Sequence, residues 1–417
     1  MSNIYVTFRR VFIFSILKKS NIKFVKLFFF PLICILPFGF LNYFFLKKTG
    51  EISPLKKIIS YQLTNNGIYG SALHSNVYPY KIALYSKIKP DIVVVGSSTV
   101  LQFRENFFNT KFVNLGRTVN YPFEGEKLIH DILKIHKPKI IIFGIDFWWG
   151  NDSKEYTEGL NFNHHKDHGQ KLSPDGIIAP LKWIFSGKLE VKDYLNILSG
   201  SEDFNQSNNL GINAKFNRVG FAKDGSLYEL NKVYKNSYDI EAKKFFKTLK
   251  RIELKKKQFI KGNKVSNARL KSIQKIIYVL KSAGVNVITF VNPLPPLIYE
   301  EIQKNQKNYS YINLFRNKLL KIHNFHYDFF NPDSLNTSNC EFLDGFHGGD
   351  IVAARILNSF SKDKKNNITK LLNQKYLKFL LLNYKDMVLS NNHYKNKFEK
   401  EIDFLDFGCI KKPNTNY

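Results

Sequence analysis

The fold is decided by eight residues, Asp91-Ile-Val-Val-Val-Gly-Ser-Ser98. Four consecutive apolar residues, mostly β-branched, are typical of a strand that is buried on both faces. The strand ends at Gly96, and two serines follow it before a helical pattern begins. A turn of this kind can hold a nucleophilic hydroxyl above a parallel sheet, but an ordinary polar turn after a strand has the same composition. The rest of the chain has to separate these two interpretations.

Strands and helices alternate on the C-terminal side of this stretch. Apolar runs predict further strands at residues 111–115, 139–143, 285–291 and 325–330. Apolar residues at helical spacing predict helices at residues 123–136, 268–283 and 348–360. Strands that alternate with helices of this length predict an α/β fold with a parallel, doubly wound sheet.

The composition favours a folded protein in anionic surroundings. Hydrophobic residues make up 44% of the 417 residues, which is enough for one large α/β domain with insertions or for two smaller domains. The formal net charge is +29, and this excess favours a membrane surface, an acidic glycan or a nucleic acid as partner. A nucleic-acid partner is disfavoured, because the sequence has no zinc finger, no RNA-binding sheet signature and no basic helix with heptads.

The segment Leu27–Leu46 is 20 residues long and has no charge. At about 1.5 Å per residue, a helix of this length spans the hydrocarbon core of a bilayer. The basic flank is heavier before the segment than after it, so the positive-inside rule places residues 1–26 in the cytoplasm and the main domain outside. The run is longer than a usual signal-peptide core, and no small-x-small cleavage site follows it closely. We therefore expect one retained transmembrane helix in the cytoplasmic membrane, with the main domain periplasmic or at the cell surface.

Three stretches lie outside the alternation of strands and helices. Residues 47–89 contain several Pro and Gly breaks and are interpreted as a juxtamembrane connector to an α/β domain at 90–360. Residues 150–262 are rich in Asn, Gly, Ser, Asp and Lys and predict an insertion over the edge of the sheet. Residues 361–417 form a basic tail, whose Leu/Tyr-rich helical patch at 376–389 either packs on the domain or lies against a membrane surface.

Neither the histidines nor the cysteines predict a metal site. His164 and His168 have the spacing of two ligands on a helix, but with His165 they lie in a polar stretch without a helical pattern, where side chains are mostly solvated. No pair among the three cysteines has the spacing of metal ligands. If the main domain lies outside the cytoplasm, Cys340 and Cys409 either form a disulfide or remain two free thiols. No metal ion or organic cofactor is expected.

Three polar residues far apart in the sequence are candidates for one site. Ser98 follows the first strand, and Asp344 and His347 precede the last predicted helix. The carboxyl ends of all strands in a doubly wound sheet face the same crevice, so these side chains can meet there. A hydroxyl, an imidazole and a carboxylate in that order supply a nucleophile, its base and the group that orients the base. Taken alone, Asp-Gly-Phe-His is also compatible with a helix-capping acid and a surface histidine.

Together these blocks resemble the SGNH, or GDSL-like, hydrolase superfamily. That family places its nucleophilic serine just after the first strand and an Asp-x-x-His near the C-terminus, which match Ser98, Asp344 and His347. The resemblance implies a three-layer α/β/α sandwich and an oxyanion hole made by a glycine amide after the second strand and an asparagine after the third. Asn114-Leu-Gly116 matches the glycine block, but the asparagine block reads Gly144-Ile-Asp146.

The carboxylate of Asp146 leaves the oxyanion side open, because an ionised Asp cannot donate a hydrogen bond. Four outcomes fit the sequence: weaker esterase chemistry, a protonated Asp146, another donor such as Asn151 or Asn292, or a lost activity. Asn292 directly follows the strand at 285–291, at the edge where open α/β sheets bind ligands.

The altered nucleophile block Gly96-Ser97-Ser98, the single N-terminal anchor and the late Asp-x-x-His are similar to the DltD-type branch of this superfamily. That resemblance implies acyl transfer onto a cell-envelope polymer, beside a membrane-bound O-acyltransferase. We therefore expect an extracytoplasmic serine O-acyl esterase or acyltransferase that acts on an envelope polysaccharide or glycan. The alternative is a non-catalytic envelope assembly or glycan-binding protein that keeps the fold.

Overall fold

The computed structural model describes residues 36–153, 173–201, 208–235, 243–363, 366–389 and 399–411. The chain divides into two compact units. The smaller unit comprises residues 1–53 and 170–207, and the larger unit comprises residues 54–169 and 208–417. The predicted insertion at 150–262 is therefore divided between the two units.

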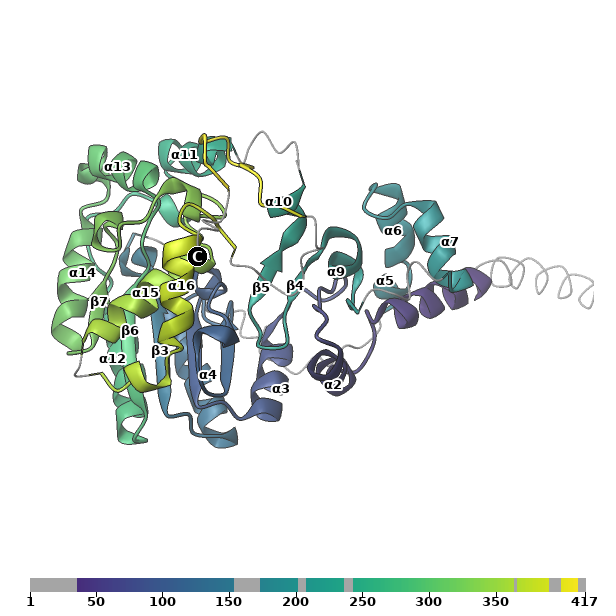
Figure 1. Cartoon of the computed structure of the whole chain (residues 1–417), viewed down its shortest axis with the longest axis horizontal. Coiled ribbons are helices and arrows are strands. Elements are labelled where there is room, and N and C mark those ends of the chain that lie inside the picture. The colour runs from purple at the N-terminus through teal and green to yellow at the C-terminus, as the bar shows by residue number, and fades with distance from the viewer. Residues whose placement is uncertain are drawn as a thin grey trace, which may run out of the picture. The chain divides into compact units, whose positions relative to one another are not determined.

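A five-stranded parallel sheet forms the centre of the larger unit (Figure 1). Its strands are β1 (Ile92–Gly96), β2 (Phe112–Gly116), β3 (Ile140–Ile145), β6 (Asn286–Val291) and β7 (His326–Asp328). Their spatial order is β2-β1-β3-β6-β7. The chain adds β2 on one side of β1 and the later strands on the other side, so the switch point lies between β1 and β3. Doubly wound sheets bind their ligands outside such a switch point. The prediction of an α/β fold with a parallel sheet is confirmed.

The predicted helices are present with small shifts of their ends. They are α4 (Pro122–Ile135), α12 (Asn267–Ser282) and α15 (Asp350–Lys362). Further helices of the larger unit are α2 (Leu55–Asn65), α3 (Tyr78–Ile88), α9 (Ile212–Asn217), α10 (Leu230–Tyr234), α11 (Phe246–Glu253), α13 (Pro296–Lys304), α14 (Tyr311–Ile322) and α16 (Gln374–Asn383).

Helices cover both faces of the sheet. Phe143 in β3 and Phe290 in β6 point to opposite faces, because they are offset by one residue in the register of the two strands. Phe143 lies against α4, where a Cβ at Gly125 would be 3.7 Å from its ring. Phe290 packs against Phe360 of α15, with ring centroids 5.8 Å apart. Burial on both faces is the reason that the strands read as unbroken apolar runs.

The prediction that residues 47–89 are a connector is wrong for residues 54–89, because these residues form α2 and α3 of the larger unit. Two of the prolines that suggested a loop stand at the starts of these helices. Pro54 is the N-cap residue of α2, and Pro79 lies in the first turn of α3. Proline is tolerated there because the first amides of a helix have no intrahelical acceptor.

The part of the predicted insertion after residue 208 contains a hairpin of β4 (Val219–Phe221) and β5 (Leu227–Glu229). Gly225 in its turn has a φ of 84°, a left-handed conformation that favours glycine. No sequence pattern predicts these strands, because each is three residues long and too short to show a period. His164, His165 and His168 lie outside the described residues.

The C-terminal tail packs on the larger unit, which is one of the two predicted alternatives. α16 buries Leu377 and Leu380 and contacts α15. Cys340 and Cys409 form a disulfide, with their Cα atoms 5.9 Å apart. Of the two alternatives for these cysteines, the structure has the disulfide.

The smaller unit consists of helices in its described part. Residues 36–49 form one helix, and α5 (Pro174–Ile177), α6 (Ala179–Phe185) and α7 (Val191–Ser199) follow much later in the chain. Residues 27–35 of the predicted transmembrane segment lie outside the described residues. Within the part of the chain that the structure describes, no helix is long and apolar enough to cross a bilayer.

Candidate active site

Ser98 lies at the carboxyl edge of the sheet, two residues after the end of β1 at Gly96. It is the first residue of a short 3₁₀ helix, η1 (Ser98–Val100). Ser97 caps this helix, because its Oγ accepts a hydrogen bond from the Thr99 amide at 3.3 Å. The sharp turn from strand to helix places the Ser98 side chain beside the switch point between β1 and β3.

The structure brings Ser98, His347 and Asp344 together in one hydrogen-bonded chain. The Ser98 Oγ lies 2.8 Å from the His347 Nε2. The His347 Nδ1 lies 2.8 Å from the Asp344 Oδ2 on the other side of the ring. The side chains of His347 and Asp344 are 22% and 33% exposed, so an incoming substrate has access to them. The arrangement has the order and spacing of a nucleophile, a base and an orienting carboxylate.

The loop that carries Asp344 and His347 is fixed by its own backbone. The Asp344 Oδ1 accepts hydrogen bonds from the amides of Phe346 and His347, both at 3.0 Å. The amide of Leu343 donates to the carbonyl of His347 at 2.8 Å and closes the loop. Gly345 lies so close to α11 that a Cβ would be 2.4 Å from Thr248. The i,i+3 spacing therefore holds the carboxylate beside the imidazole without a longer-range contact.

The electrostatics of the pair favour an ionised Asp344. Burial alone would raise the pKa of Asp344, but the charge and hydrogen bond of His347 hold it well below its usual range. Burial alone would lower the pKa of His347, but the charge and hydrogen bond of Asp344 raise it above its usual value. A carboxylate that stabilises the imidazolium in this way makes His347 a stronger base towards Ser98.

Gly116 lies next to β1 but does not offer its amide. Its N–H donates to the Oδ1 of Asn114, two residues earlier, at 2.7 Å. A Cβ at Gly116 would lie 3.0 Å from both Val100 and Leu101, so this position requires a glycine for close packing. The residue matches the glycine block in sequence, while its hydrogen-bond donor is already used within its own strand.

Asp146 and Asn292 meet at Thr99, the residue after Ser98. The Thr99 hydroxyl donates to the Oδ1 of Asp146 at 2.8 Å, and it accepts from the Nδ2 of Asn292 at 3.0 Å. Asp146 follows β3 and is 1% exposed, whereas Asn292 follows β6 and is only partly buried. Asp146 thus acts as an acceptor, which is what its chemistry allows. Asn151, the other predicted donor, instead holds the carbonyl of Ile260 at 2.7 Å.

A buried ion pair that no sequence pattern predicts joins the segment after η1 to the start of α15. Arg104 follows η1 and lies 2.8 Å from Asp350, which begins α15 three residues after His347. Both side chains are almost fully buried, and the guanidinium also lies 3.8 Å from the ring of Tyr228 in β5. The pair therefore connects the segment after Ser98, the segment after His347 and the β4–β5 hairpin. The sequence around Arg104, Val100-Leu-Gln-Phe-Arg-Glu-Asn-Phe107, alternates between apolar and polar residues and carries no signal that this arginine is buried.

Charged residues of the hairpin region also act on the site. The negative charge of Glu229 raises the pKa of His347, and the positive charge of Lys232 opposes this effect. Lys232 also contributes to the lowered pKa of Asp344. These residues belong to β5 and α10, so the part of the predicted insertion after residue 208 does contribute to the site.

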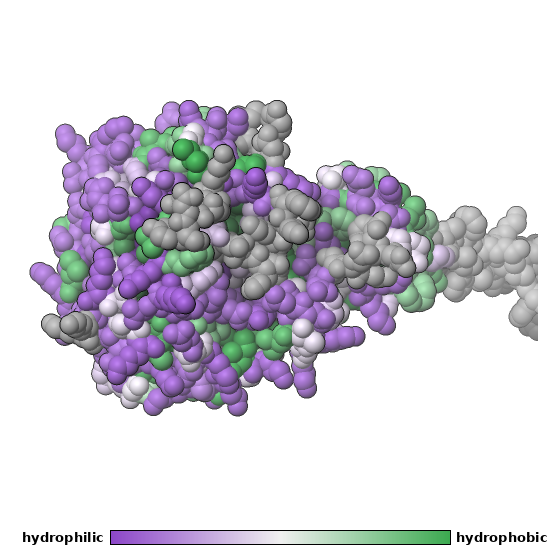
Figure 2. All heavy atoms as spheres, viewed as in Figure 1, coloured by the Kyte–Doolittle hydropathy of each residue, from purple (hydrophilic) through white to green (hydrophobic). Residues whose placement is uncertain are grey.

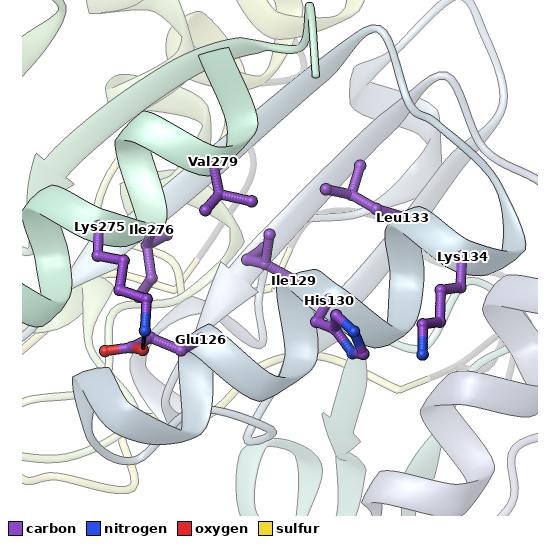
Figure 3. A pocket seen from close by; sticks show the side chains of 8 residues that line it. All are labelled: Glu126, Ile129, His130, Leu133, Lys134, Lys275, Ile276 and Val279. Atoms are coloured by element: carbon purple, nitrogen blue, oxygen red, sulfur yellow. Dashed lines mark ion pairs between the residues drawn. The ribbon is translucent and has the colours of Figure 1, made fainter. Parts of the chain in front are cut away.

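A groove with a volume of about 460 Å³ lies elsewhere, between α4 and α12 (Figure 3). Its walls are apolar, and Lys275 pairs with Glu126 at 2.6 Å on its rim. No residue of the Ser98 chain lines it. Beside Thr99 and Asn292 there is a cavity of about 10 Å³, close to the size of one water molecule.

No family model matches the chain, and no curated protein matches it. The function is therefore inferred from the geometry of the residues and from the resemblance of their blocks to the SGNH superfamily.

Proposed function

We propose that this protein is a serine O-acyl esterase or acyltransferase of SGNH type. The observation that carries the proposal is the chain of two 2.8 Å contacts from Ser98 through His347 to Asp344. This chain lies at the carboxyl edge of a parallel sheet in the order β2-β1-β3-β6-β7, beside its switch point. Helices on both faces of that sheet support an SGNH-like three-layer α/β/α sandwich for the larger unit.

The acyl transfer begins when the Ser98 Oγ attacks the carbonyl carbon of an ester. His347 takes the serine proton at Nε2, and Asp344 stabilises the imidazolium that results. The tetrahedral intermediate collapses, the imidazolium gives its proton to the leaving alkoxide, and an acyl-serine remains. Water or a glycan hydroxyl then attacks the acyl-serine with His347 again as base, which regenerates the Ser98 hydroxyl.

The oxyanion is held by the Ser98 amide and by the side chain of Asn292. The amide group of Asn292 has two hydrogens, and one of them is donated to Thr99. Asn292 reaches over the end of β3, since a Cβ at Gly144 would lie 3.3 Å from its Nδ2. It takes the role of the asparagine that the family places after the third strand, and Asp146 orients it through Thr99. The Gly116 amide is not assigned this role, because it already donates to Asn114.

The substrate is an acylated polysaccharide or glycan of the cell envelope, with a membrane-bound O-acyltransferase as partner. The resemblance to the DltD-type branch supports this choice, as does the net charge of +29, which suits polyanionic surroundings. The Cys340–Cys409 disulfide supports a main domain outside the cytoplasm, where disulfides persist. The apolar segment Leu27–Leu46 supports attachment to the cytoplasmic membrane.

A serine-directed fluorophosphonate probe tests the proposal on the full chain in detergent or membranes. We expect covalent labelling of the native protein, no labelling of Ser98→Ala, and strongly slowed labelling of His347→Ala. Ser282→Ala is the matched control, because it removes an exposed hydroxyl at the end of α12 and should leave Ser98 reactive. Labelling that persists in Ser98→Ala would contradict the assignment of the nucleophile.

The second candidate is a non-catalytic envelope assembly or glycan-binding protein. It is favoured by the oxyanion side, where the Gly116 amide is occupied and a carboxylate replaces an amide at Asp146. Absence of labelling in a native protein whose circular dichroism shows an intact fold would favour this candidate.

A further inference from the structure

The smaller unit carries a dense set of exposed apolar side chains. Ten of the 20 exposed large hydrophobic residues lie in it, six on the helix at 36–49 and four at 178–195, although it holds about a seventh of the described residues. Phe185 at the end of α6 is 89% exposed, and Val191 and Leu195 on α7 are both more than half exposed. Green, hydrophobic spheres accordingly lie at the surface of this unit in Figure 2. Patches of this kind on a protein surface mark an interaction site.

These helices are attached to the side of the helix at 36–49. The Tyr194 hydroxyl of α7 donates to the Oδ1 of Asn42 at 2.8 Å, and its ring lies 4.8 Å from that of Phe45. The Lys48 ammonium donates to the carbonyl of Leu198 at 2.8 Å. A Cβ at Gly39 would lie 3.8 Å from Ile177 of α5. The contacts thus run along the helix over about three turns and fix α5–α7 beside it.

The position of these contacts along the sequence sets their depth in a membrane. Gly39 and Asn42 belong to the uncharged segment Leu27–Leu46. With a rise of 1.5 Å per residue, Gly39 lies about 10 Å before the end of that segment at Leu46. The headgroup layer on each side of a bilayer is about 5–8 Å thick. If Leu27–Leu46 spans the membrane, the contacts of α5–α7 therefore run from about 10 Å inside the hydrocarbon core, at Gly39, to just outside it, at Lys48.

The polar residues near the patch fit the same depth. The Lys188 ammonium lies 5.7 Å from the centre of the Trp183 ring, and Lys192 precedes the exposed Leu195. Lys is typical of the membrane interface, where its apolar stem is buried and its ammonium stays in water, whereas the Trp183 ring is buried within the unit. Acidic and basic residues are balanced in α5–α7, so the apolar side chains and not the charge would carry the contact.

We propose that α5–α7 form a platform in the membrane interface, with Phe185, Val191 and Leu195 inserted among the lipid acyl chains. The occupant of the apolar patch is thus the outer leaflet of the bilayer that holds the anchor. The proposal rests on the membrane attachment of Leu27–Leu46 and not on the acyl-transfer chemistry. A short amphipathic helix can bury its apolar face about 5–10 Å into a bilayer in this way.

Photo-crosslinking tests this platform on the full chain, reconstituted into phosphatidylcholine–phosphatidylglycerol vesicles that contain an alkyne-bearing phospholipid. The photoreactive residue p-benzoylphenylalanine replaces Phe185 in one variant. It replaces Phe38, which is 60% exposed in the anchor segment, in a second variant. It replaces Phe246, which is exposed on α11 of the larger unit, in the matched control.

We expect lipid adducts at Phe185 and Phe38, with a yield at least several-fold above that at Phe246. Lipid adducts at Phe38 without any at Phe185 would overturn the platform and leave the anchor intact. A protein adduct at Phe185, to a second copy or to another protein, would overturn it in favour of a protein partner. The absence of lipid adducts at Phe38 would refute the anchor and the platform together, whereas fluorophosphonate labelling of Ser98 is judged separately.

Discussion

The two sides of the candidate site are built in different ways. On the proton-transfer side, Ser98, His347 and Asp344 lie in line with contacts of 2.8 Å, and each atom faces the group that it would serve. On the oxyanion side, the Gly116 amide donates to Asn114, and Asp146 accepts from Thr99. The first side has the arrangement that the proposed acyl transfer needs, whereas on the second side the polar groups hydrogen-bond to one another.

The contrast follows from how each side is held. Asp344 and His347 are three residues apart in a loop that closes on itself, so local geometry is enough to align them. The oxyanion side depends on groups from the ends of β1, β2, β3 and β6, so its geometry requires contacts between residues far apart in the sequence. We therefore expect that any weakness of the proposed enzyme lies in its oxyanion donors and not in its base. The variants below test that distinction, in order of the expected effect.

Asp344→Asn should have the largest effect, because it acts on the proton-transfer side. The asparagine Oδ1 can still accept from the loop amides, but its Nδ2 faces the His347 Nδ1 and imposes the wrong tautomer. We expect a loss of about 10⁴-fold in kcat for a chromogenic acyl ester. Such a loss in a variant with native secondary structure would support the role of Asp344 in orienting His347. A loss below tenfold would contradict that role.

The pH dependence of kcat in the native protein is a second test of the proton-transfer side. His347 acts as base only when it is neutral, and Asp344 raises its pKa above the ordinary value of 6.5. The rate should therefore fall as the pH drops through a midpoint above 6.5. In Asp344→Asn the raising charge is lost while burial still lowers the pKa, so the midpoint should move to lower pH. If the rate of the native protein fell only at a pH well below 6.5, this would contradict the interaction between Asp344 and His347.

Arg104→Met should destabilise the whole larger unit, since Arg104 links the two loops. Removing one partner of a buried pair leaves Asp350 uncompensated and costs about 3–5 kcal/mol of unfolding free energy. Urea denaturation measures this loss. The double variant Arg104→Met/Asp350→Leu removes both charges and should recover much of it. Lys139→Met is the matched control, because the more exposed Lys139–Asp91 pair contributes about 1 kcal/mol or less. An equal loss of unfolding free energy in this control would show that burial of the Arg104–Asp350 pair is not the cause.

The sequence was sufficient for the parts of the molecule that are periodic or local. The buried strands could be recognised from their apolar runs, and Ser98 and His347 from their places at strand and helix ends. Thr99, Arg104 and Glu229 could not, because their importance comes from partners 47 to 246 residues away or from a hairpin without a period. The role of Asn114 could have been predicted, because an Asn two residues before Gly116 has the spacing of a side-chain acceptor for the Gly116 amide.

Asn292→Ala tests whether the oxyanion side has kept a donor. If the free hydrogen of Asn292 Nδ2 binds the oxyanion, its removal should lower kcat by about 10²–10³-fold with little change in KM. Asn267→Ala, at the exposed start of α12, is the control for a lost asparagine and should leave the rate unchanged. If both variants have native rates, the oxyanion is stabilised elsewhere and the contrast between the two sides loses its basis.

Asp146→Asn should have the smallest effect, and its sign decides what the carboxylate does. An asparagine at this position can still accept from the Thr99 hydroxyl through Oδ1, so a positioning role predicts a loss of less than tenfold in kcat. Asp146→Ala removes the acceptor and should cost more than Asp146→Asn, because Thr99 then no longer holds Asn292. A gain in rate for Asp146→Asn would instead mean that the native chain lacks a donor there. In that case the oxyanion side is impaired, and the non-catalytic alternative becomes the better account of Asp146.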